Sequence, residues 1–130
     1  MRDWGDCDDF CTHAFGELLR QFPGLFSKII PWTKSQDFWV RRAAAVILIY
    51  PLKRGIFSHN EVICICNALM TDTHHLVQKG SGWLLKEYSI MSPEFVYNYL
   101  KENINRMPRR TFRYALEKLG QNERIELMSL

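Results

Sequence analysis

Hydrophobic residues recur along this chain at helical spacing, and no stretch keeps the strict alternation that is typical of a strand. The first predicted helix covers residues 6–21, and every fourth residue from Phe10 to Phe22 forms its apolar stripe. Pro23-Gly24 ends it, and a shorter helix follows over residues 24–33. A third helix is predicted over 36–50, since Ser35 can cap its start and Pro51 is expected to stop it.

Local start signals predict the remaining helices. Ser58 and Glu61 have the spacing of a capping box at the start of a fourth helix. Ser92 followed by Pro93 has the pattern of an N-cap and a first helical position. The later predicted helices cover about 58–70, 73–88, 93–107, 108–119 and 122 onward. The pattern indicates an all-α fold, an α-solenoid or HEAT-like superhelix of antiparallel helix pairs.

The composition is sufficient for one hydrophobic core. The chain has 130 residues, of which 47% are hydrophobic, and this is enough for a single domain. The longest apolar run, residues 43–50, is too short to span a bilayer. The first residues are acidic, where a signal peptide would need a basic segment before an apolar one. We therefore expect an intracellular protein in the cytoplasm.

The spacing of the four cysteines is more typical of buried thiols in a core than of a metal site. Cys7 and Cys11 would share a helix face, whereas Cys64 and Cys66 are two residues apart and point to different sides of a helix. A tetrahedral zinc site fits this arrangement poorly, and small buried thiols are the simpler interpretation. The sequence predicts no metal and no other cofactor.

Charge is distributed in blocks, although the net charge is only +3. Residues 1–22 carry five acids against two bases, and residues 23–60 carry six bases against one acid. Residues 61–100 are acidic again, and residues 101–130 are basic. Two basic blocks suit a partner with distributed negative charge, such as a nucleic acid backbone. Solvated helix faces would produce the same pattern, so composition leaves both interpretations open.

Arg42 does not fit a plain core helix. The segment "DFWVRRAAAVILIY" is apolar almost all round, yet Arg42 lies on the same side as Phe38 and Ile49. Its guanidinium needs either a buried carboxylate, such as an aspartate of the first helix, or a groove where it binds phosphate. The sequence does not decide between these two.

The segment "LVQKGSGWLLKEY" combines a tryptophan with lysines and glycines. Leu76, Gly80, Leu84 and Tyr88 are four residues apart and predict the core face. Lys79, Gly82, Trp83 and Lys86 fall on another face. Each glycine inside a helix costs about 1 kcal/mol relative to alanine, so this pair needs a packing or ligand reason. Trp83 could lie along a nucleic acid backbone or cover a helix junction.

The opening segment "RDWGDCDDF" has two kinds of residue. Trp4 and Asp8 are four apart, so an indole and a carboxylate would project together from a helix. The other aspartates spread to other sides and favour the positive N-terminal end of the helix.

Four stretches together resemble the AlkD family of DNA alkylation repair proteins, which are HEAT-like helical DNA glycosylases. They are "DWGDCDD", "DFWVRRAAAVILIY", "LVQKGSGWLLKEYS" and "RMPRRTFRYALEKL", in family order and spanning nearly the whole chain. The resemblance implies duplex DNA with alkylated bases as the partner. It also implies excision of positively charged purines, such as 3-methyladenine and 7-methylguanine, without flipping the base into a pocket.

Residue roles follow from the same resemblance. Trp4, Asp8 and Trp83 match the family's active-site residues, and Arg42 in Trp-x-x-Arg matches the arginine placed beside the DNA at the lesion. The bases expected to contact DNA are Arg41, Arg42, Lys79, Lys86, Arg109 and Arg110.

One departure concerns the start of the chain. The family normally has several helices before its Trp-x-x-x-Asp motif, which here begins at Trp4. We therefore expect residues 1–130 to form one helical-repeat domain that corresponds to the C-terminal part of a longer family domain. Further repeats or another subunit, such as a second copy, would then cover the first helix.

Overall fold

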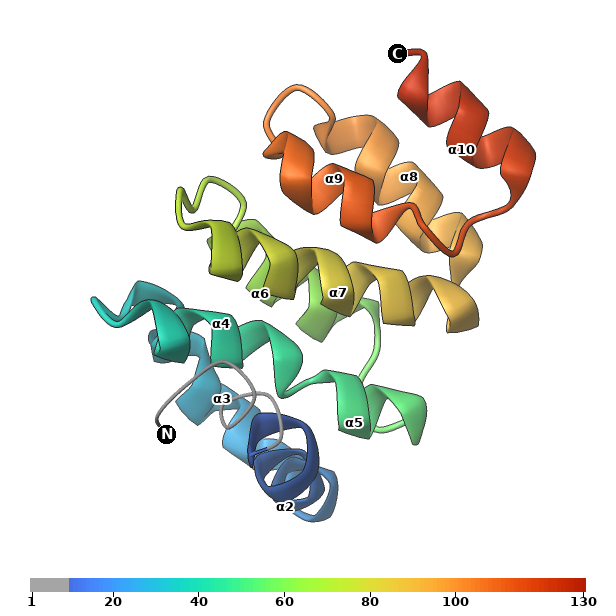
Figure 1. The fold of residues 1–130 in the computed structure, drawn as a ribbon. Coiled ribbons are helices and arrows are strands. Elements are labelled where there is room, and N and C mark those ends of the chain that lie inside the picture. The colour runs from blue at the N-terminus through green and yellow to red at the C-terminus, as the bar shows by residue number, and fades with distance from the viewer. Residues whose placement is uncertain (1–9) are drawn as a thin grey trace.

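The computed structural model describes residues 10–130, and side chains from residue 13 onward. Every regular element in this range is helical, which confirms the all-α prediction (Figure 1). No helix in the described range is long and apolar enough to cross a membrane.

The first helix has a π-helical segment, η1 (Phe10–Phe15), that continues into α2 (Gly16–Gln21). Leu19 is buried, whereas Leu18 is 40% exposed and Phe22 is 57% exposed. The predicted apolar stripe through Leu18 and Phe22 is therefore wrong. A π-helix takes more residues per turn than an α-helix, so counting by fours from Phe10 loses register before α2 begins.

The second predicted helix is a series of short turns. It consists of η2 (Pro23–Leu25), α3 (Phe26–Ile29) and η3 (Ile30–Lys34), in which only Ile29 and Thr33 are fully buried. The third helix is divided into α4 (Phe38–Val46) and α5 (Ile49–Lys53). Pro51 lies inside α5, contrary to the prediction that it stops the helix. It is the third residue of a new helix, where an amide hydrogen has no partner within the helix and none is needed.

Five further helices complete the chain, each within a few residues of its predicted position. They are α6 (His59–Ala68), α7 (His75–Met91), α8 (Pro93–Asn103), α9 (Arg109–Ala115) and α10 (Gln121–Met128). The Ser58–Glu61 capping box forms at the start of α6, where the Ser58 amide donates to Glu61 Oε1 at 2.9 Å. Local signals were therefore sufficient to locate these elements.

The helices are arranged in two layers. The front layer contains α4 with α5, α7 and α9 side by side, and α3, α6 and α8 lie behind it (Figure 1). α7 packs against α4 on one side and α9 on the other. The core is buried between the layers and includes Ala44, Ile47, Val62, Leu84 and Leu100.

Two glycines allow α7 to approach both of its neighbours. A Cβ at Gly80 would lie 3.0 Å from Cγ of Arg42 on α4. A Cβ at Gly82 would lie 2.5 Å from Cβ of Tyr114 and 3.0 Å from the backbone oxygen of Thr111, both on α9. The glycines therefore have a packing reason, and Gly82 is buried against α9.

Candidate nucleic-acid interface

The structure brings Arg42 and Trp83 together. Arg42 is only 2% exposed, and its Nη1 donates to the carbonyl oxygen of Leu76 at 2.7 Å. Its guanidinium carbon lies 5.9 Å from the centre of the Trp83 ring, which is partly buried against the core. A guanidinium at this distance interacts with the face of an indole. Two residues that are 41 positions apart thus form one unit at the junction of α4 and α7.

Trp4 and Asp8, the other two predicted members of the active site, lie outside the described residues. Their position relative to Arg42 and Trp83 therefore stays a prediction.

Arg41 connects two loops. Its Nε lies 2.7 Å from Oδ2 of Asp72, and its Nη1 donates to the carbonyl oxygens of Ser35 at 2.9 Å and Gln36 at 3.2 Å. These contacts join the loop before α4 to the loop before α7. Arg41 therefore has a structural role whether or not it also contacts DNA.

Two histidines that the sequence pattern did not single out lie at the start of α7. His74 caps the helix, because its Nδ1 accepts from the amide of Leu76 at 3.1 Å, and its ring stacks on Phe38 at 3.9 Å. The exposed His75 follows, with its ring 4.8 Å from that of His74. The only signal in the sequence was the dipeptide itself, directly before a helix.

His75 lies in a positively charged environment. Desolvation lowers its pKa, and so do the charges of His74, Arg110 and Lys79. These neighbours come from both α7 and α9. Arg110 also donates to Gln78 of α7, so the starts of α7 and α9 bring Arg110 and Lys79 close to His75.

The basic residues of α9 divide between two sides. Arg110 donates from Nη1 to Oε1 of Gln78 at 2.9 Å, which places it at the start of α7. Arg109 instead contacts α10, where its Nη2 lies 3.9 Å from Sδ of Met128. Only Arg110 of this pair therefore joins Lys79 and His75.

Lys86 lies further along α7. Its Nζ is 3.4 Å from Oε2 of Glu117 and 5.8 Å from the centre of the Tyr114 ring. The ion pair partly neutralises its charge, so the basic region is strongest at the other end of the helix.

Helix orientation adds to this charge. α4, α7 and α9 run in the same direction, so their N-termini meet at one edge of the front layer (Figure 1). An N-terminus carries partial positive charge from the aligned peptide dipoles. His75, Lys79 and Arg110 lie along this edge with Arg41, whose charge is partly neutralised by Asp72, and we call it the basic edge. An edge of this kind attracts a polyanion.

The two cysteines with described side chains are part of the packing. Cys66 is buried, and burial raises the pKa of its thiol to about 12, so the reactive thiolate is strongly disfavoured. Cys64 lies two residues earlier in the same helix, α6, and is partly buried. Within residues 10–130 no cluster of His, Cys, Asp or Glu has the arrangement of a metal site.

Comparison with protein families gives a match that covers most of this helical chain. The family model described as DNA alkylation repair enzyme matches residues 1–119. The chain belongs to this family. A search of curated proteins finds no match.

Membership of the DNA alkylation repair enzyme family confirms the resemblance seen in the sequence and suggests that the protein binds DNA. The match includes every element from η1 to α9 and stops before α10. The Arg42–Trp83 pair and the basic edge therefore both lie in the part of the chain that the family shares.

Proposed function

We propose that this chain is a DNA glycosylase that excises positively charged alkylpurines, such as 3-methyladenine and 7-methylguanine, without flipping the base. Family membership supports DNA alkylation repair in general. The observation that supports the finer proposal is the contact between Arg42 and Trp83, because it places an indole ring beside a guanidinium at the junction of α4 and α7.

The chemistry is hydrolysis of the bond between the deoxyribose C1′ and the base. Alkylation gives the purine a positive charge, so the base leaves with the bonding electrons as a neutral alkylpurine. Positive charge then develops on the sugar, and water adds to C1′ and loses a proton. Asp8 would stabilise the developing charge and orient the water. The indoles of Trp4 and Trp83 would contribute cation–π contacts to the sugar.

The basic edge would bind the DNA backbone. Lys79 and Arg110 provide side-chain charge, and the N-termini of α4, α7 and α9 add their dipoles. Contacts to phosphate position a duplex without reading its sequence, which suits an enzyme that must act on lesions in any context. A base that stays in the stack needs no pocket, in contrast to enzymes that flip their target.

Release of 7-methylguanine from N-methylated duplex DNA tests this function. We expect the wild-type chain to release the base and Asp8→Asn to slow release about a hundredfold, because the variant loses a charge that acts on the transition state. Asp3→Asn is the matched control, since it removes an aspartate from the same acidic segment that we assign to the helix end.

Two results would contradict the proposal in different ways. Full activity of Asp8→Asn would remove Asp8 from the catalytic assignment. Absence of any release by the wild-type chain would instead favour the alternative, a noncatalytic HEAT-like module that binds DNA or protein. Binding to undamaged DNA with a steep salt dependence and no base release would support it.

A further inference from the structure

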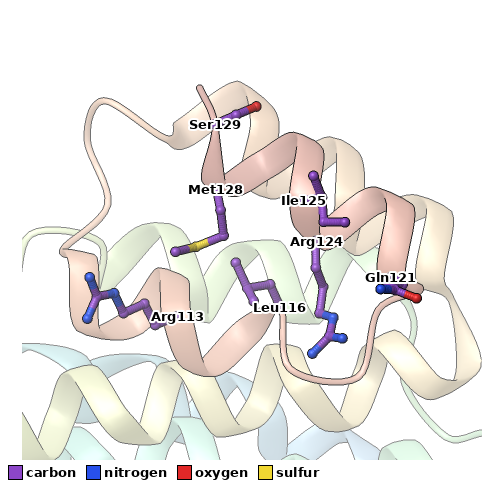
Figure 2. A pocket seen from close by; sticks show the side chains of 7 residues that line it. All are labelled: Arg113, Leu116, Gln121, Arg124, Ile125, Met128 and Ser129. Carbon is purple, nitrogen blue, oxygen red and sulfur yellow. The ribbon is translucent and has the colours of Figure 1, made fainter.

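A groove lies between α9 and α10, away from the Arg42–Trp83 pair. Its volume is about 530 Å³. Figure 2 shows Met128 of α10 and Leu116 at the end of α9 pointing toward one another across it, with Arg113 toward one end and Arg124 toward the other. The family match ends at residue 119, so one wall of this groove belongs to the helix that the match leaves out.

The groove lies where a further helix could pack beside α9 in the front layer. α4, α7 and α9 lie side by side, and α8 and α10 pack together at the same end of the molecule (Figure 1). A helix placed beside α9 and across α10 would therefore continue the packing that α9 makes with α7 and α8. The shape of the groove thus favours a helix as its occupant.

Apolar side chains line the groove without being covered. Ile125 is 60% exposed and Met128 is 42% exposed, whereas Leu127, on the opposite side of α10, is fully buried. Leu116 forms the floor of the groove, next to Ile125 and Met128. Exposed apolar side chains that gather in a groove are typical of a protein interaction site. A partner helix would place its own apolar stripe against them.

The charged residues of α10 are separated by face. Arg124 lines the groove, whereas Glu126 turns toward α8, where it accepts from the Tyr97 hydroxyl and lies 3.6 Å from Lys101. Glu123 lines a different hollow beside Glu94 and Tyr97 of α8. The acids of this helix therefore face α8, and an arginine faces the groove.

The rim of the groove is cationic as a result. Arg113 and Arg124 line it, no acidic side chain does, and neither arginine has an ion pair within the described part of the chain. Arg109 adds a third positive charge next to Met128. A helix that fits this groove needs acidic residues beside its apolar stripe.

We propose that the α9–α10 groove binds an acidic amphipathic helix of a partner protein. The apolar floor favours this occupant over DNA, since phosphates gain nothing from contact with Ile125 and Met128. The proposal does not depend on glycosylase activity, because the lining residues are separate from Arg42, Trp83 and Lys79.

Two synthetic helical peptides test the proposal. Both have leucines at i, i+3, i+4 and i+7, and the flanking positions are glutamate in one and lysine in the other. We expect the glutamate peptide to bind the 130-residue chain, as measured by fluorescence anisotropy, and the lysine peptide to bind much more weakly. The variant Arg113→Glu with Arg124→Glu should weaken binding of the glutamate peptide about tenfold and improve binding of the lysine peptide, because two attractive pairs become repulsive.

Lys28→Glu with Lys34→Glu is the matched control, because it makes the same change in net charge at exposed positions of α3 and η3. Equal weakening in this control, or no binding of the glutamate peptide, would overturn the proposal. Loss of affinity for duplex DNA in the Arg113/Arg124 variant, without any peptide binding, would assign the groove to DNA instead. Methylpurine release, measured in the same variants, reports separately on the proposed glycosylase.

Discussion

Arg42 shows how one residue can be held in place by the backbone of a neighbouring helix. Its guanidinium is buried, and burying a charge is unfavourable unless polar groups compensate for it. The carbonyl oxygen of Leu76 accepts from it, and the missing side chain of Gly80 leaves room for its Cγ and Nη1. The position of the guanidinium under Trp83 is thus determined by α7 and not by α4 alone.

His75 should make DNA binding depend on pH. In the free protein its pKa is lowered by desolvation and by the electrostatic influence of His74, Arg110 and Lys79. Phosphates on the basic edge would offset these charges and raise the pKa again, so binding would take up a proton. We expect affinity for duplex DNA, measured by fluorescence anisotropy, to increase as the pH falls from about 8 to about 6.

The variant His75→Gln isolates this effect, because it keeps a polar side chain that does not titrate. It should flatten the pH dependence and leave affinity at about pH 8 nearly unchanged. An unchanged pH profile in this variant would show that His75 does not face the DNA.

α7 is the central element of the molecule, because it contacts α4 on one side and α9 on the other. It also carries the partly buried Lys79 and Trp83, so any movement of the helix would shift the basic edge and the indole together. The glycines that allow both contacts therefore affect function as well as packing.

Gly82→Ala should destabilise the fold. The added Cβ would meet Cβ of Tyr114 at 2.5 Å and the Thr111 carbonyl oxygen at 3.0 Å, and neither atom is at the end of a flexible side chain. Overpacking of this kind costs about 1–3 kcal/mol, and the better helix propensity of alanine recovers about 1 kcal/mol. We expect the free energy of unfolding in urea to fall by up to about 2 kcal/mol.

Gly24→Ala provides the control, since a Cβ there has no atom within 4 Å. It should leave the free energy of unfolding nearly unchanged. Equal stability of the two alanine variants would contradict the close α7–α9 contact.

One edge of the front layer gathers positive charge from several helices. The charge comes from three helices that start there and from side chains far apart in sequence, such as Lys79 and Arg110. Net charge does not reveal this, since the whole chain is only +3. The distribution of charge, more than its total, determines where a duplex would bind.

Lys79→Gln with Arg110→Gln should reduce both DNA affinity and its salt dependence. Each phosphate contact contributes about 0.9 to the slope of log K against log salt concentration, so removing two contacts should reduce the slope by about 2. Titrations at several salt concentrations measure it. Lys28→Gln with Lys101→Gln, on α3 and α8 of the back layer, should leave the slope unchanged. Equal slopes for all three proteins would exclude the basic edge as the DNA interface.

The sequence by itself determined the helical class, most helix starts and the family. These features depend on local signals, such as the Ser58–Glu61 capping box and Ser92-Pro93, and on motifs that can be read in order. Local signals act over a few residues, so they need no knowledge of the fold. The expected roles of Trp4 and Asp8 also came from the sequence and stay predictions.

Only the tertiary structure decided which residues meet. The π-helical turn moved Leu18 to the surface, Gly82 turned out to face α9, and Arg109 and Arg110 separated to opposite sides of α9. It also placed Arg42 against Trp83 and left the α9–α10 groove open. Each of these outcomes depends on packing between helices distant in the chain, and the periodicity of a single helix contains no information about its neighbours.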